Sequence, residues 1–116
     1  MNNKRLNKVL GNIGEEVAKN YLKRQGYKII QTNFKNKIGE IDIVAYDKDI
    51  LVFVEVKYRK TSIFGLPREA VDNRKQQKIR AVAMGYINKY KLHDTPCRFD
   101  VLEILDNEIT LIKDCF

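Results

Sequence analysis

The sequence predicts an α/β fold in which helices flank a central sheet. Apolar residues recur at helical spacing in two segments, one near the N-terminus and one ending near residue 90. Runs with strand patterning, bounded by turn residues, fill the middle and the end of the chain. The expected order is helix, three strands, helix, two strands, which is typical of an α/β sandwich. At 116 residues, the chain suits one domain spanning residues 1–116.

The first helix is predicted from apolar residues on one stripe: Val9, Ile13, Val17, Ala18, Tyr21 and Leu22. Gly11 and Gly14 weaken its first turns, so we expect its firm part to begin near Ile13. Gly26 is a C-terminal stop signal.

Three strands are expected next, over residues 27–33, 38–46 and 50–58, with a turn at 47–49. The third strand opens with Ile-Leu-Val-Phe-Val, which is apolar on both faces. Such a run is typical of a central strand covered on both sides.

Residues 60–66 read as a loop, and Pro67 suits the first turn of a second helix. Two final strands are expected over residues 98–105 and 108–112, around a turn at 106–107. The apolar stripe of the second helix consists of Ile79, Val82, Ala83, Tyr86, Ile87 and Tyr90.

Composition excludes some classes of protein. No apolar run approaches the ~20 residues that span a bilayer, and the polar N-terminus is unlike a signal peptide. We therefore expect a cytoplasmic protein without a membrane partner, with Cys97 and Cys115 reduced. Two cysteines and one histidine are too few for a zinc cage. The net charge of +7 favours polyanionic partners, although abundant Lys, Asn and Ile also fit an AT-rich genome.

The expected second and third strands bring chemistry-bearing side chains together. In an antiparallel hairpin, directly opposite residues point to the same face. If paired residue numbers sum to 97, Asp42 lies opposite Glu55; if they sum to 95, Asp42 is diagonal to it. Both registers put Asp42, Glu55 and Lys57 on one face. An even sum would mix polar and apolar positions, which argues against it.

Opposed carboxylates need a counter-charge. Two like charges at ~4 Å cost about 4 kcal/mol at an effective dielectric of 20. A divalent cation would offset this, and oxygen ligands suit Mg²⁺ or Mn²⁺. Such an ion with an ammonium group beside it fits phosphodiester hydrolysis. Because two carboxylates favour the charged form of Lys57, we expect an orienting ammonium rather than a general base.

Less specific interpretations remain open for these charges. Glu55 and Lys57 alone could form a surface ion pair. Glu15 and Glu16 on the first helix read as a solvated face, unless that helix packs on the Asp42 face and brings a carboxylate to the metal.

Basic residues surround the predicted site along the chain. They suit either a phosphate track or a solvated surface. The candidates for nucleic-acid binding are Arg59, Lys60, Arg68, Arg74, Lys75 and Lys78.

The wider pattern resembles a known family. Asp42, then a gap of twelve residues, then Glu55-Val56-Lys57 resembles the signature of the PD-(D/E)xK, or restriction-endonuclease-like, superfamily. Over nearly the whole chain the sequence resembles the YraN-like family of uncharacterised bacterial proteins. That resemblance rests on Gly14-Glu15, Ala18, Tyr21-Leu22, Gly26-Tyr27, Asn33, Gly39-Glu40-Ile41-Asp42, Val52 to Lys57, Arg59, Gly65, Pro67, Glu69-Ala70-Val71, Lys75 and Arg98-Phe99-Asp100-Val101.

The resemblance implies a restriction-endonuclease-like core with a mixed central sheet, related to Holliday-junction resolvases. By position, it implies Asp42, Glu55 and the Val56 carbonyl as metal ligands, Lys57 as the catalytic lysine, and Glu15 as the helix carboxylate of the metal site. Because resolvase-like relatives act as dimers, it also implies a homodimer.

The leading hypothesis is a Mg²⁺-dependent endonuclease, with Mn²⁺ as a substitute, acting on structured or branched DNA without a small-molecule cofactor. The second hypothesis is a nuclease fold that binds nucleic acid without cutting it. The third is a protein-interaction subunit whose charges only confer solubility.

Overall fold

The computed structural model describes residues 3–59, 71–105 and 108–116. The elements follow the predicted order, which confirms the α/β architecture. They are α1 (Asn3–Arg24), β1 (Lys28–Lys35), β2 (Glu40–Asp47), β3 (Ile50–Arg59), α2 (Asn73–Tyr90), β4 (Cys97–Leu105) and β5 (Glu108–Ile112).

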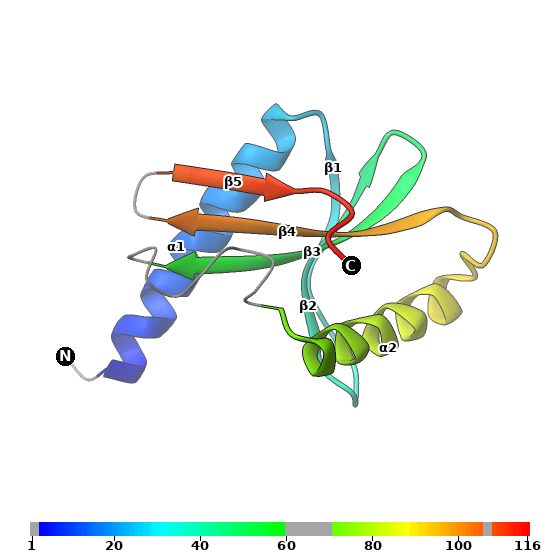
Figure 1. Ribbon diagram of the computed structural model, residues 1–116, viewed down its shortest axis with the longest axis horizontal. Helices are drawn as coiled ribbons and strands as arrows, with labels where there is room; N and C mark the ends of the chain where they lie inside the picture. The colour runs from blue at the N-terminus through cyan, green and yellow to red at the C-terminus, as the bar shows by residue number, and fades with distance from the viewer. Residues whose placement is uncertain (1–2, 60–70, 106–107) are drawn as a thin grey trace.

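The five strands form one sheet in the order β1-β2-β3-β4-β5. All neighbours pair antiparallel except β3 and β4, which run parallel, so the sheet is mixed as predicted. Parallel neighbours need a crossover connection, and the segment containing α2 supplies it. Figure 1 shows α1 crossing the sheet behind β3, β4 and β5, while α2 lies near β2.

Each face of the sheet carries its own hydrophobic core. The core under α1 consists of Ala18, Leu22, Tyr27, Ile43, Ala45, Val52, Val54, Leu102 and Ile104. The core under α2 includes Phe34, Ile41, Val44, Leu51, Phe53, Ile79, Val82, Tyr86, Phe99 and Val101. Because β3 contributes to both cores, the prediction of a strand covered on both sides is confirmed. No helix in the described parts of the chain is long and apolar enough to cross a membrane.

Helix α1 is longer at its N-terminus than expected and stops where expected. It begins at Asn3, before Val9, the first residue of the predicted apolar stripe. Gly14 packs against β3, where an added Cβ would lie 3.2 Å from Cδ2 of Tyr58, so tertiary packing uses this glycine despite its low helix propensity. At the other end, Gly26 has φ +93° and the N–H of Tyr27 donates to the Leu22 carbonyl at 2.9 Å. This is a Schellman stop, which favours glycine.

Helix α2 begins at Asn73, and Asp72 is its N-cap. The Asp72 carboxylate accepts a hydrogen bond from the backbone N–H of Lys75 at 2.9 Å. A capping aspartate of this kind stabilises a helix start by about 1 kcal/mol. The expected loop over 60–66 and the expected helix start at Pro67 lie outside the described residues.

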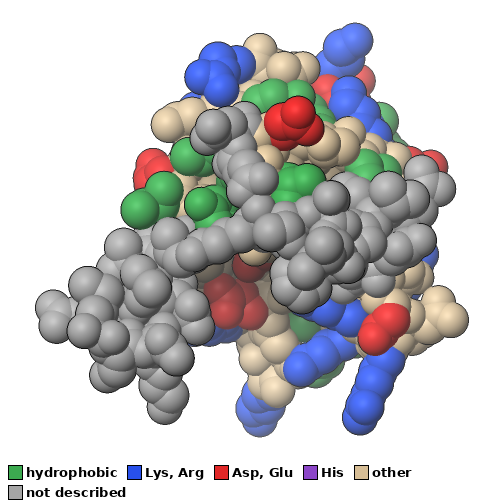
Figure 2. All heavy atoms as spheres, turned by 60° about the vertical axis from the view of Figure 1, so that its left-hand side comes forward, with side chains coloured by type: hydrophobic (Ala, Val, Ile, Leu, Met, Phe, Trp, Pro, Cys, Tyr) green, Lys and Arg blue, Asp and Glu red, His purple; other side chains and the backbone are tan. Residues whose placement is uncertain are grey.

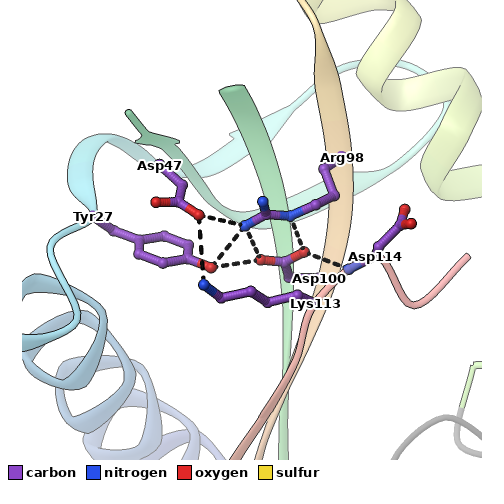
Figure 3. Close-up of polar contacts among 6 residues, drawn as sticks. All are labelled: Tyr27, Asp47, Arg98, Asp100, Lys113 and Asp114. Atoms are coloured by element: carbon purple, nitrogen blue, oxygen red, sulfur yellow. Dashed lines mark hydrogen bonds and ion pairs between the residues drawn. The ribbon is translucent and has the colours of Figure 1, made fainter. Parts of the chain in front are cut away.

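A network of charged groups joins strand ends that are far apart in sequence (Figure 3). At its centre, the fully buried Asp100 accepts hydrogen bonds from Arg98 Nε at 2.8 Å and the Tyr27 hydroxyl at 2.8 Å. Arg98 also donates to Asp47 at 2.9 Å and thereby lowers the pKa of that carboxyl group. The backbone N–H of Asp114 donates to Asp100 at 2.9 Å. The network thus ties β1, β2 and the C-terminus to β4.

Candidate active site

The β2–β3 hairpin brings Asp42 and Glu55 together. Val44 pairs with Phe53, so paired residue numbers sum to 97, the first of the two expected registers. Both Val44 and Phe53 belong to the core under α2. Glu55 lies two residues after Phe53 and therefore points towards the α2 side. The alternation of β2 breaks at Asp42, because Ile41 and Val44 both pack in the core under α2.

The buried Glu55 forms a hydrogen-bonded pair with the partly buried Asp42. Glu55 is only 8% exposed. Burial raises the pKa of Glu55 to about 8, and its hydrogen bond to Asp42 and the Asp42 charge act in the same direction. Asp42 Oδ2 accepts a hydrogen bond from the backbone N–H of Val56 at 2.8 Å. In the metal-free protein, burial and the neighbouring carboxylate therefore disfavour the charged form of Glu55.

Lys57 lies two residues beyond Glu55 on the same face, as predicted. Burial and the neighbouring Lys75 lower its pKa to about 8, while Glu55 and Asp42 raise it less strongly. The sequence-based expectation that two carboxylates favour the charged form holds for their own contribution, but burial and Lys75 outweigh it. It omitted desolvation and the second lysine, neither of which is visible in the local sequence.

Lys75 reaches this face from the first turn of α2. Its Nζ lies 3.9 Å from Oε1 of Glu55. The start of the helix is held by the Asp72 cap and by Gln76, whose side-chain amide donates to the Val71 carbonyl at 2.8 Å. Val71 is 2% exposed and packs in the core under α2. The backbone that carries Lys75 is therefore anchored, and two lysines face two carboxylates.

Glu15 of α1 is held by a residue of β1. The side-chain amide of Asn33 donates to Glu15 Oε1 at 2.7 Å. Thr32 and Phe34, on either side of Asn33, pair with Ile43 and Ile41, on either side of Asp42, so this contact brings Glu15 to the part of β1 that lies beside Asp42. Within the described residues, no three His, Cys, Asp or Glu side chains gather as a metal-binding group. The predicted metal-ligand roles of Glu15 and of the Val56 carbonyl rest on the family resemblance.

Sequence reasoning missed Glu103 of β4. In the parallel pairing Glu103 lies beside Lys57, and its side chain is 2% exposed. The signal in the sequence is a carboxylate inside the apolar run 101–104. Its neighbour could not be identified without the β3–β4 register, because the two strands are joined through a long crossover.

The predicted basic residues divide between two places. Lys75 lies over the carboxyl pair, whereas the Lys78 side chain lies over Gly39 in the β1–β2 turn, 3.1 Å from where a Cβ would be. Arg74 is exposed on α2, and Arg59 ends β3. Figure 2, which brings the carboxyl ends of β3 and β4 towards the viewer, shows acidic side chains with basic side chains beside them. The predicted positions Lys60 and Arg68 are outside the described residues.

Burial of Glu55 makes stability depend on pH. Between its ordinary pKa of 4.5 and about 8, the unfolded chain has lost the Glu55 proton while the folded chain retains it. Stability contributed at this position therefore falls as pH rises through that range. We expect Glu55→Gln to stabilise the metal-free protein relative to wild type by about 2 kcal/mol more at pH 7.5 than at pH 5. Urea unfolding at both pH values measures this, and an equal effect at both would contradict it.

Comparison with known proteins identifies the family. The model of the uncharacterised protein family UPF0102 matches residues 14–104. A UPF0102 protein of Clostridium tetani (strain Massachusetts / E88) is 49% identical over 116 residues, covering 95% of each chain. A UPF0102 protein of Clostridioides difficile (strain 630) is 48% identical over 112 residues, covering 95% of this chain and 98% of the relative. The family resemblance predicted from the sequence is therefore confirmed, and the chain belongs to the uncharacterised protein family UPF0102.

Proposed function

We propose that this protein is a metal-dependent endonuclease that hydrolyses phosphodiester bonds in structured or branched DNA. The observation that carries the proposal is the carboxyl pair of Asp42 and the buried Glu55, with Lys57 close to both. A functional site is a frequent reason for several strongly shifted pKa values in one cluster.

The residues present fit a hard divalent cation. The raised pKa of Glu55 means that the fold makes a second negative charge beside Asp42 unfavourable, and a divalent cation would reverse that preference. Mg²⁺ commonly uses only one or two protein carboxylates and completes its shell with water and substrate phosphate. Asp42 and Glu55 would hold Mg²⁺, or Mn²⁺ in its place.

Each side chain then has a defined role in hydrolysis. The bound ion would polarise the phosphate and lower the pKa of an attacking water. Asp42 and Glu55 would hold the ion. The Lys57 ammonium lies where it can orient the attacking water or stabilise charge that develops on the phosphate oxygens. With a pKa of about 8, Lys57 also has a substantial neutral fraction slightly above neutral pH.

Several features support DNA as the substrate. The chain carries a net charge of +7, and Arg74, Lys75 and Lys78 lie on the first turns of α2, from which Lys75 reaches Glu55. Phosphate contacts of this kind position a nucleic acid without reading its sequence. The resemblance to resolvases supports branched structures and a homodimer. We accordingly propose DNA as the partner and the cytoplasm as the location of the protein.

The test is cleavage by the purified protein of nicked, flapped, four-way and plain duplex DNA with Mg²⁺ or Mn²⁺. We expect at least one branched substrate to be cut faster than the duplex, and Glu55→Gln to abolish cutting. Absence of cleavage in every substrate, or equal cleavage by the variant, would sink the proposal.

A non-catalytic nucleic-acid-binding module is the second candidate. It is favoured by the ion pair between Lys75 and Glu55, which gives the carboxyl pair a counter-charge without metal. This candidate expects salt-dependent DNA binding that survives Asp42→Asn and Glu55→Gln, weakens in Lys75→Gln and Lys78→Gln, and shows no response to Mg²⁺.

A further inference from the structure

The carboxyl pair is faced by two lysines that come from different elements. Lys57 belongs to the sheet, whereas Lys75 reaches Glu55 from α2 at 3.9 Å. The Lys75 side chain is 41% exposed, while that of Glu55 is 9% exposed. One partner of this ion pair is thus fixed in the sheet, and the other ends a flexible side chain at the edge of solvent.

A cation on Glu55 would compete with Lys75 for the same oxygen atoms. Charges of like sign at ~4 Å repel each other, and the repulsion increases as water is excluded. The Lys75 backbone is anchored by Asp72, but its four-carbon side chain has solvent on one side. Lys75 can therefore leave Glu55 by rotation about its side-chain bonds, with α2 in place.

We propose that Lys75 is a resident counter-cation, which holds the Asp42–Glu55 pair in the metal-free protein and passes to a phosphate of the nucleic acid when the pair takes up a divalent cation. This inference rests on the metal site of the proposed function. In this exchange, Lys75 pairs with Glu55 in the metal-free protein and with a phosphate of the nucleic acid in the metal-bound protein. The Lys75 ammonium and the divalent cation therefore do not lie against Glu55 at the same time.

The direct test is to measure Mn²⁺ affinity by calorimetry at pH 7.5, without nucleic acid. Removing the competing ammonium should tighten binding, so we expect Lys75→Gln to bind Mn²⁺ about tenfold more tightly than wild type. Lys75→Met should behave in the same way, and Lys75→Arg should remain close to wild type because it retains the charge. Lys89→Gln is the matched control: it makes the same charge change on the same helix, ~20 Å from Lys75.

The outcomes separate the exchange from a general charge effect. If Lys75→Gln and Lys75→Met bind Mn²⁺ no more tightly than wild type, the exchange is overturned. It is equally overturned if Lys89→Gln gains as much affinity as the Lys75 variants. Thermal unfolding of each variant without metal verifies that the fold is retained.

The second half of the exchange is tested by DNA binding with Ca²⁺, a hard cation that also takes oxygen ligands. Each phosphate contact contributes about 0.9 to the slope of log affinity against log salt for duplex DNA. The slopes of wild type and Lys75→Gln should differ by about 0.9 with Ca²⁺ and by close to zero without it. Equal differences in both conditions would show that Lys75 is not transferred to phosphate.

Failure of this inference is distinguishable from failure of the proposed function. Cleavage by wild type together with unchanged Mn²⁺ affinity in the Lys75 variants would contradict the exchange and support the nuclease function. Tighter Mn²⁺ binding by those variants, with no cleavage of any DNA, would support the exchange and contradict the nuclease function. If neither wild type nor the variants bind Mn²⁺, the exchange is overturned together with the metal site.

Discussion

Lys57→Gln should reduce the rate of DNA cleavage by roughly a hundredfold to a thousandfold, the usual effect of removing one group that stabilises transition-state charge. Lys57 lies on the same sheet face as Glu55, and its ammonium interacts with both Glu55 and Asp42. The variant should still bind Mn²⁺ at least as tightly as wild type, because Lys57 is not a ligand. Single-turnover cleavage and Mn²⁺ calorimetry on one preparation measure the two properties. Cleavage at the wild-type rate would contradict the assigned role.

Lys57→Arg separates two explanations of that loss. Arginine keeps a positive charge but cannot be deprotonated in a protein. If the charge alone matters, the arginine variant should keep much of the activity. If the neutral amine accepts a proton from the attacking water, arginine should be as damaging as glutamine. In the second case, the wild-type rate should also rise with pH towards the lowered pKa of Lys57, about 8.

Arg98→Met should destabilise the fold by about 3–5 kcal/mol, since removing one partner of a buried ion pair leaves the other charge uncompensated. Asp100 is fully buried and receives two hydrogen bonds from the Arg98 guanidinium, at 2.8 and 3.0 Å. Its other partners, Tyr27 and Asp114, donate hydrogen bonds but bring no positive charge to it. Urea unfolding at pH 7 measures the loss.

Lys113→Met is the matched control for this prediction. Lys113 also faces Asp47, at 3.6 Å, but its side chain is 54% exposed, and exposed ion pairs contribute at most about 1 kcal/mol. An equal loss in both variants would contradict the argument from burial. The double variant Arg98→Met/Asp100→Leu should recover part of the lost stability, because it removes the isolated buried charge.

The parts of the fold that the sequence could predict depend on local patterns. The apolar stripes of both helices, the turn at 47–49 and the β2–β3 register all involve residues close in the chain. The expected closeness of Asp42, Glu55 and Lys57 followed from that hairpin, and the structure brings the three side chains together. Helix ends were less predictable, because the packing of Gly14 on Tyr58 lets α1 continue through a glycine that weakens an isolated helix.

Features that join distant segments could not be predicted in this way. The contact between Lys75 and Glu55 depends on how α2 docks on the sheet, and the position of Glu103 beside Lys57 depends on the parallel β3–β4 pairing. Asp100 was part of the family pattern, but its partner Tyr27 is 73 residues away in the chain. No periodicity within one element reports on such a pair.

The spacing between Asp42 and Glu55 has a parity. Twelve residues separate them: five in each strand, 43–47 and 50–54, and two in the turn, 48 and 49. Lengthening both strands by one residue, or shortening both by one residue, changes this number by two and keeps the carboxylates opposed. A change of one residue turns one carboxylate to the other face unless a bulge absorbs it. An insertion or deletion of an even number of residues therefore keeps the two carboxylates together, whereas an odd number separates them.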